Sequence, residues 1–334
     1  MGTPGRGHRS YLQFGREATY GTPVAATHRV PILRSSVVPQ IGVHRSGLLQ
    51  RGTVTAARNR SDQYQGPIFY RATIELELWY EGLLLILDGI MGTSTFGANG
   101  GVTTGANPYA HNWAANREFL NSYTMEIIEG NIPSSACQRL VGAKMDAAII
   151  RGGVSDVVCR LTLEVMSKLY QTNQTPTGGL NAVTALPVLF HEASTVDDGT
   201  ADAAADVRMK NFEVTLRNHL TERHYLGSVN TDEPHANDFV EAMFRFKKEF
   251  QTRVMLDAVN AFTAGTPSLV FGSSASKRFT IQTGGGDAQI TEYNHPIEGA
   301  GIIEQDVTWD TDSAQGVGCQ IQIIAENTQA TITT

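Results

Sequence analysis

The stretch Ile68–Gly92, IFYRATIELELWYEGLLLILDGIMG, predicts a β-strand that runs directly into a short α-helix. Apolar side chains from Tyr70 to Leu78 alternate with polar ones, which is typical of a strand with one buried and one solvent-exposed face. From Glu81 onward the apolar residues follow helical spacing, and Gly92 is placed to end the helix. The helical apolar positions are Leu83, Leu84, Leu87, Ile90 and Met91.

A similar pattern occurs later in the chain, in Val240–Gly265, VEAMFRFKKEFQTRVMLDAVNAFTAG. Apolar positions from Val240 to Phe246 alternate with polar ones. Thr252 is expected to cap a helix that Gly265 ends. The flanking strands also correspond in pattern: LVGAKMDAAII and VVCRLTLEVM follow the first stretch, and IEGAGIIEQDVTW and VGCQIQIIAEN follow the second. This alignment gives Cys159 and Cys319 similar places and indicates an internal repeat of low identity.

The repeat predicts a mainly β chain with a few helices (α+β), built from two tandem β-sandwich or barrel units with one packing helix each. The expected division is an extended arm at residues 1–30, a first unit at 31–170, a junction at 171–206 and a second unit at 207–334. Residues 52–66 are expected to form the tip of a long hairpin. The loop 93–120, anchored by Tyr109, Trp113 and Phe119, is expected to be a surface elaboration.

Composition excludes several classes of protein. Of the 334 residues, 41% are apolar and 18% are charged, which suits a globular chain, and no apolar run is long enough to cross a bilayer. Three cysteines are too few and too widely spaced for a disulfide framework or a zinc site.

Charge is distributed unevenly. Residues 1–60 hold nine arginines and a single acid, Glu17, whereas the remaining residues hold 17 basic and 32 acidic side chains. A basic arm on an acidic body can bind nucleic acid or dock on a neighbouring copy.

Candidate catalytic groups are weak. The acids Glu75 and Glu77, and likewise Glu304, Asp306 and Asp310, share strand faces and could supply the carboxylate pair of a glycoside hydrolase. Acids at alternate strand positions are more often part of a solvated face. No catalytic residue, metal ligand or cofactor site is therefore assigned from these positions.

The remaining motifs lack the context that their chemistry requires. Ser274–Lys277 matches the S-x-x-K tetrad of serine acylases without its companion motifs. Gly284–Gly286 is not followed by the residues of a phosphate-binding loop. His219 and His224 are five positions apart, which does not suit a shared metal ion on a helix. These observations favour a protein that is not an enzyme.

The segment Ser10–Ile32, SYLQFGREATYGTPVAATHRVPI, resembles the opening of tail tube (major tail) proteins of long-tailed, non-contractile bacteriophages. Further similarity lies in the leucine-rich helix, the Gly-Ala-Lys entry at Gly142–Lys144 and the strand at Phe212–Asn218. The opening match is carried by Gly15, Arg16, Glu17, Thr19, Tyr20, Gly21, Thr22, Val30, Pro31 and Ile32.

The resemblance implies a structural virion protein whose rings stack into a hollow tail tube that conducts DNA from capsid to host during ejection. Each tube unit of the family contributes four strands to an inner barrel, with its helix outside. The implied partners are other copies of the chain, the tape measure, terminator and baseplate proteins, and duplex DNA bound without sequence preference. The implied location is the phage tail after synthesis in the bacterial cytoplasm, with no membrane and no cofactor.

A chain with two such units is expected to close as a trimer with pseudo-sixfold symmetry. The wet strand faces would then line the channel: Arg71, Thr73, Glu75, Glu77, Glu241, Arg245, Lys247 and Glu249. The arm and the hairpin tip would contact the next ring through Tyr11, Phe14, Arg16, Tyr20, Arg51, Arg58 and Arg60.

Three alternatives remain open at this point. One is a tail terminator or baseplate ring, which does not stack. Another is a tube of a bacterial secretion or contractile injection system. The most distant is a glycoside hydrolase that uses a carboxylate pair containing Glu75 or Asp306.

Overall fold

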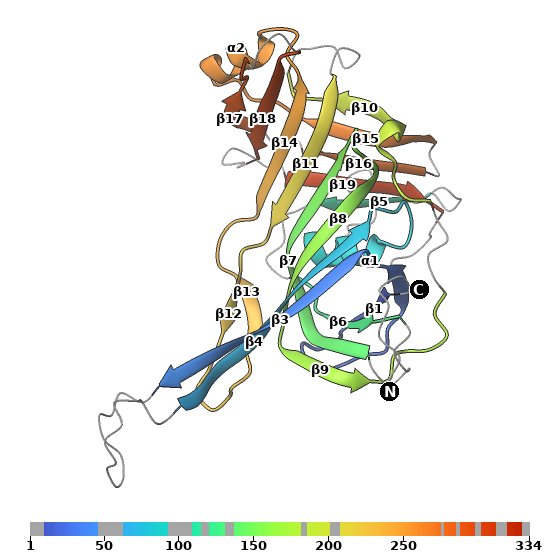
Figure 1. The fold of residues 1–334 in the computed structure, drawn as a ribbon, viewed down its shortest axis with the longest axis vertical. Coiled ribbons are helices and arrows are strands. Elements are labelled where there is room, and N and C mark those ends of the chain that lie inside the picture. Colours follow the sequence, from blue (N-terminus) through green and yellow to red (C-terminus); the bar gives the residue numbers. More distant parts are fainter. Residues whose placement is uncertain are drawn as a thin grey trace.

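A computed structural model of the chain describes residues 10–45, 63–92, 109–114, 120–130, 137–181, 186–200, 208–274, 277–284, 288–297, 302–311 and 319–328. The described chain consists mainly of antiparallel β-sheet with two α-helices (Figure 1), which confirms the expected fold class. None of the described helices is long and apolar enough to cross a membrane.

The elements of the first half lie in the following order: β1 (Tyr11–Arg16), β2 (His28–Pro31), β3 (Arg34–Arg45), β4 (Gln63–Glu77), α1 (Leu84–Met91), β5 (Tyr109–Ala114), β6 (Tyr123–Ile128), β7 (Cys137–Gly153), β8 (Asp156–Ser167) and β9 (Leu169–Gln174). Those of the second half are a 3₁₀ turn (Phe190–Glu192), β10 (Ala193–Asp197), β11 (Met209–Arg217), β12 (Leu220–Arg223), β13 (Asp232–Ala236), β14 (Glu241–Glu249), α2 (Val254–Ala261), β15 (Ser268–Ser274), β16 (Lys277–Gly284), β17 (Gln289–Asn294), β18 (Glu304–Asp310) and β19 (Cys319–Asn327).

The large sheet contains a continuous row of strands in the order β3-β4-β8-β7-β11-β14-β18-β17, all antiparallel. The row joins the two halves of the chain, because β7 pairs with β11. The N-terminal part of β7 leaves this row and pairs with β6 and β9, and β6 pairs in turn with β1. A second sheet has the order β10-β15-β16-β19-β5.

The same strand order occurs once in each half. The row contains β3-β4-β8-β7 and then β11-β14-β18-β17. The outer layers are β1-β6-β7-β9 and β10-β15-β16-β19. Along the chain, α1 lies between β4 and β6, as α2 lies between β14 and β15.

This order corrects the sequence alignment of the two halves. Cys159 lies in β8 of the large sheet, whereas Cys319 begins β19 of the second sheet, so the two cysteines are not equivalent. The counterpart of β8 is β18, and the counterpart of β19 is β9. The alignment was one strand out of step because β9 and β17 are short and polar, and periodicity did not detect either of them.

Helix α1 was predicted correctly. It spans Leu84–Met91, ends at Gly92 with φ 81°, and has all eight residues buried. Helix α2 lies where it was expected, but both predicted caps were wrong. Its N-cap is Arg253, without a side-chain bond, and its C-cap is Phe262 in the left-handed region at φ 50°. Within α2 only Met255 is buried, so this helix lies at the periphery.

Two segments expected to lie outside the body belong to the sheets. Residues 11–16 form β1 between β2 and β6 rather than an extended arm, because Leu12 and Phe14 are apolar and fully buried. Within the loop 93–120, residues 109–114 form β5, which pairs with β19 and buries Trp113. Residues 1–9, 46–62 and 93–108 lie outside the described residues.

One hydrophobic core extends through both halves of the chain. It contains Leu12 and Ile74 from the first half together with Phe244 and Trp309 from the second. The core lies between one face of the large sheet and the remaining elements, with α1 inside it. The opposite face of the row is therefore the one that presents polar side chains.

Candidate assembly surface

The open face of the row, here called the polar face, carries charged side chains in register across neighbouring strands. On β4 the buried residues Ala72, Ile74 and Leu76 alternate with exposed or half-exposed polar ones, as the sequence predicted. One line of paired positions crosses the sheet with acids and bases close to each other. It consists of Glu77, Arg160, Arg151, Glu213, Arg245, Thr308 and Glu292.

Cross-strand ion pairs connect these charges. Glu75 accepts hydrogen bonds from Arg151 at 2.8 Å and from Arg160 at 3.2 Å. Arg245 lies 3.7 Å from both Glu213 and Glu292. Oppositely charged side chains that face each other on neighbouring strands stabilise a sheet. A basic group that is paired with an acid also attracts a phosphate less strongly.

A second cluster lies where β11, β14 and β18 end near the β7–β8 turn. Glu304 accepts a hydrogen bond from Lys210 at 2.6 Å and pairs with Lys247 at 2.8 Å. The hydrogen bonds from these two lysines lower the pKa of Glu304 to about 2. A shallow cavity of about 300 Å³ adjoins the cluster and is lined by Arg151, Lys247 and other residues of the polar face.

Two carboxylates of the polar face, Glu75 and Glu304, are not suited to general acid catalysis. Burial raises the pKa of Glu75, but the hydrogen bonds from Arg151 and Arg160 outweigh it, so the net pKa is below its usual value. A glycosidase acid needs a raised pKa, and Glu75 and Glu304 both have lowered ones. Neither Glu75 nor Glu304 therefore supports the glycoside hydrolase alternative.

The other candidate motifs have structural partners. Ser274 faces Lys277 across the β15–β16 hairpin, and Lys277 pairs with Glu192. His219 pairs with Glu241 at 3.1 Å, and His224 packs near Phe69. Among the described residues, no group of three or more His, Cys, Asp or Glu side chains is arranged to hold a metal ion.

The N-terminal motif is organised around Glu17, a carboxylate that is only 6% exposed. One oxygen accepts bonds from the Gly21 amide at 2.8 Å and the Ser122 hydroxyl at 3.0 Å. The other accepts bonds from the Thr124 hydroxyl and the Gly142 amide, each at 2.8 Å. Glu17 thus joins the turn after β1 to β6 and β7.

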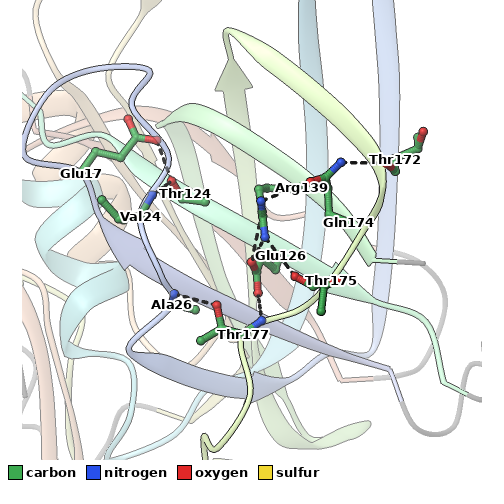
Figure 2. A network of polar contacts seen from close by, with 10 residues as sticks. All are labelled: Glu17, Val24, Ala26, Thr124, Glu126, Arg139, Thr172, Gln174, Thr175 and Thr177. Atoms are coloured by element: carbon green, nitrogen blue, oxygen red, sulfur yellow. Dashed lines mark hydrogen bonds and ion pairs between the residues drawn. The ribbon is translucent and has the colours of Figure 1, made fainter. Parts of the chain in front are cut away.

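A second buried acid extends this network (Figure 2). Glu126, on β6, accepts bonds from the Arg139 guanidinium and from the Thr177 amide, and Thr177 accepts a bond from the Ala26 amide. Arg139 also bonds the Thr175 carbonyl. The sequence around Glu17 and the Gly-Ala-Lys motif at Gly142, which both carry the family resemblance, therefore meet in space. Together they hold the N-terminal segment in the sheet.

The sequence profile of the phage tail tube protein family matches residues 7–311. This chain belongs to the phage tail tube protein family. The match covers both halves of the chain, including β1 and the polar face. A comparison with curated proteins found no match. Membership of the family makes the chain a structural protein of the virion tail.

The structure places all eight residues predicted for the channel lining on the polar face of the tail tube protein. They come from β4 and β14, and each is exposed or half-exposed. Pattern reasoning missed the contributions of β8, β7 and β11, which supply Arg160, Arg151 and Glu213. The alternation in β8 was visible, but cross-strand register could not be read from one sequence.

The residues predicted for contact with the next ring have contacts within the chain. Tyr11 stacks under Arg29, and Arg16 lies 3.6 Å from Asp88. Tyr20 donates to the Asp232 carbonyl and lies near two lysines, and Phe14 is fully buried. The three arginines of the hairpin tip, Arg51, Arg58 and Arg60, lie outside the described residues.

The row ends in two strands, each of which pairs on one side only within the described chain. At one end, β3 pairs with β4, and its residues Val38 and Ile41 are about half exposed. At the other end, β17 pairs with β18, and Asn294 is exposed. An open strand edge is a template for pairing with another chain.

Proposed function

We propose that the tail tube protein closes into a ring of three chains that stacks into the tube of a long-tailed, non-contractile phage. Three rows of eight strands give 24 strands. With about 4.8 Å between strands and a tilt near 40°, the backbone diameter is roughly 48 Å, which leaves a channel of roughly 35–40 Å. Duplex DNA fits this channel.

The internal repeat supplies the register of the proposed ring seam. Within the chain the two four-strand groups join through β7 and β11, where Ile149 is opposite Thr215. Equivalent positions in the two groups are those that pair with equivalent residues of the neighbouring strands. By this criterion Asn294 on β17 is the equivalent of Ile149, and Val38 on β3 is the equivalent of Thr215. The seam between copies thus sets Asn294 of one chain opposite Val38 of the next.

The same equivalences favour two tail-tube units whose bounds differ from those expected from sequence. The first unit runs from β1 to β9, residues 11–174. The second runs from β10 to β19, residues 193–327. A heterologous contact between the end of the second unit and the start of the first closes a ring when the rotation is one third of a turn.

We place the polar face toward the channel. The core and the outer strands cover the other face of the row, so only this face can meet DNA in a closed barrel. Arg151, Arg160, Arg245 and Lys247 lie in pairs with acids, and the acids of the face repel phosphates. DNA therefore slides past without the counterion release that accompanies tight binding. Conduction is then passive, from capsid to host cell.

Stacking of rings is assigned to the β3–β4 hairpin. This hairpin extends beyond the body of the molecule (Figure 1), and Ile41 and Val43 on it are more than half exposed. The segment that connects β3 to β4 contains Arg51, Arg58 and Arg60, which can meet the acidic body of a copy in the next ring. The tape measure, terminator and baseplate proteins would contact the first and last rings.

A cysteine pair across the seam tests the ring. In the double variant Val38→Cys/Asn294→Cys, oxidation should link chains covalently into dimers and closed trimers on a non-reducing gel. The matched control keeps Asn294→Cys but moves the partner to Ser36→Cys on the same strand, which should crosslink much less. Equal crosslinking of the two pairs, or none in either, would contradict the seam.

A further inference from the structure

A short segment ahead of β10 completes the sheet contact between the two halves of the chain. Val188 donates its amide to the Leu78 carbonyl at 2.7 Å and accepts a bond from the Cys159 amide at 2.9 Å. Leu189 bridges Val158, and Pro187 bridges Trp79. Residues 187–189 therefore lie as a strand between the end of β4 and the start of β8.

The second half presents the same site, and no described residue of the chain occupies it as a strand. The Leu78 amide bonds the Cys159 carbonyl at 2.9 Å, and the Phe250 amide bonds the Ile303 carbonyl at 2.9 Å. Phe250 and Ile303 thus correspond to Leu78 and Cys159. Among the described residues, the Phe250 carbonyl and the Ile303 amide have no hydrogen-bond partner. The neighbouring Ile302 is 69% exposed.

The repeat also identifies the segment that fits this site. Residues 187–189 precede β10, and the counterpart of β10 is β1 of a first unit. A buried acid follows each of these strands, Asp198 after β10 and Glu17 after β1. His8 precedes Glu17 by the same number of residues as Leu189 precedes Asp198, so His8 is the counterpart of Leu189.

We propose that residues 5–9 of each tail tube protein insert as a strand between Phe250 and Ile303 of the neighbouring copy in the same ring. Val158, which Leu189 bridges, corresponds to Ile302, so His8 lies opposite Ile302 of the neighbour. The inference rests on the proposed ring and adds a second contact on its outer layer, beside the seam.

The occupant is another copy for reasons of position and charge. Strand β1 lies at the opposite end of the molecule from the ends of β14 and β18 that form the site (Figure 1). The segment contains Arg6 and Arg9, and the site adjoins Glu249 and Glu304. Strand addition supplies backbone hydrogen bonds without needing large side chains, which suits the sequence Gly-Arg-Gly-His-Arg at residues 5–9.

The test is a second cysteine pair, His8→Cys/Ile302→Cys, in the full chain. Oxidation of isolated, unstacked rings should give covalent dimers and trimers. The matched control, Thr22→Cys/Ile302→Cys, keeps one cysteine and moves the other along the N-terminal segment, and it should stay monomeric on the gel. The three native cysteines stay in place, and the parent chain, oxidised in parallel, gives the background from Cys319 and from the buried Cys137 and Cys159.

The outcomes separate this inference from the ring itself. Crosslinking through Val38 and Asn294 without crosslinking through His8 and Ile302 would leave the ring intact and overturn the inference. A disulfide within single chains, or one that forms only in stacked tubes, would also overturn it. Failure of both pairs would remove the ring and the inference together.

Deletion of residues 2–9 gives an independent measurement. The variant chain should keep its circular dichroism and its thermal midpoint. Its midpoint concentration for ring formation should rise about tenfold or more, as expected for the loss of roughly two backbone hydrogen bonds per contact. Ring formation at the parent concentration would contradict the proposal.

Discussion

Replacement of Glu17 by Gln is expected to destabilise the chain strongly without any change in side-chain size. Each Glu17 oxygen accepts one backbone amide and one hydroxyl: Gly21 with Ser122, and Gly142 with Thr124. Whichever oxygen becomes the amide nitrogen, one backbone N–H loses its acceptor and faces another donor. The hydroxyl at that position can rotate to accept, so its loss is partly recovered.

The magnitude follows from the bonds lost. A hydrogen bond to a charged group contributes about 1.5–3 kcal/mol, and a buried unsatisfied donor adds a desolvation penalty of similar size. Partial relaxation around the turn brings the expected loss in unfolding free energy to about 2–4 kcal/mol. Because Glu17 is buried, solvent screens these interactions little.

Urea unfolding followed by tryptophan fluorescence measures this loss. Trp113 and Trp309 are buried and report on both sheets. The urea midpoint should fall while the m-value is unchanged. The control Glu164→Gln lies on the exposed polar face and should change stability by less than about 0.5 kcal/mol. If Glu17→Gln unfolds at the same urea concentration as Glu164→Gln, the reasoning about the N-terminal motif is wrong.

Three further predictions concern stability and reactivity. Gly142→Ala should lower the unfolding free energy by about 1–3 kcal/mol, because the φ of Gly142 is +68° and a Cβ there meets the Tyr20 ring at 3.0 Å. In the same denaturation assay the control Gly178→Ala should be near neutral, because a Cβ at Gly178 meets nothing within 4 Å. Burial lowers the pKa of His28 below its usual value. The contribution of His28 to stability is therefore full above pH 6.5 and declines as the pH falls from there toward the folded pKa. The urea midpoints at pH 7.5 and 5.5 should differ less in His28→Phe than in the parent chain. Burial raises the pKa of Cys159 to about 12 and that of Cys137 to about 11. Neither thiol should therefore react with iodoacetamide at pH 8 until urea unfolds the chain. Peptide mapping that finds either one alkylated in the native state would contradict their burial.

The sequence predicted the elements with strong periodicity. Strands β4 and β14 alternate cleanly, and α1 carries a continuous apolar run with Gly92 at its end. The expected channel residues therefore lie on one face, because alternation alone determines which side chains share a side of a strand.

Elements without periodicity were not predictable from one chain. Strands β9 and β17 are polar edge strands, and β5 lies in a segment rich in turn-forming residues, so each depends on a distant partner for its structure. The caps of α2 were missed because Phe262 adopts a left-handed conformation that propensity assigns to glycine. Cross-strand register, and with it the ion pairs of Glu75, comes only from tertiary pairing.

The N-terminal motif illustrates a different limit. Its residues were recognised by resemblance, and a role outside the chain was expected for Tyr11, Arg16 and Tyr20. The buried Glu17, with its bonds to Gly142 and Thr124, indicates that the motif acts first inside the fold. A pattern of residue types cannot distinguish an internal contact from one between copies.

Electron microscopy of the purified protein, with class averages viewed down the axis, tests the central claim most directly. The account predicts hollow rings of three chains, each contributing eight strands to a continuous barrel with sixfold-like density. Rings of six chains, or particles without a pore, would contradict it.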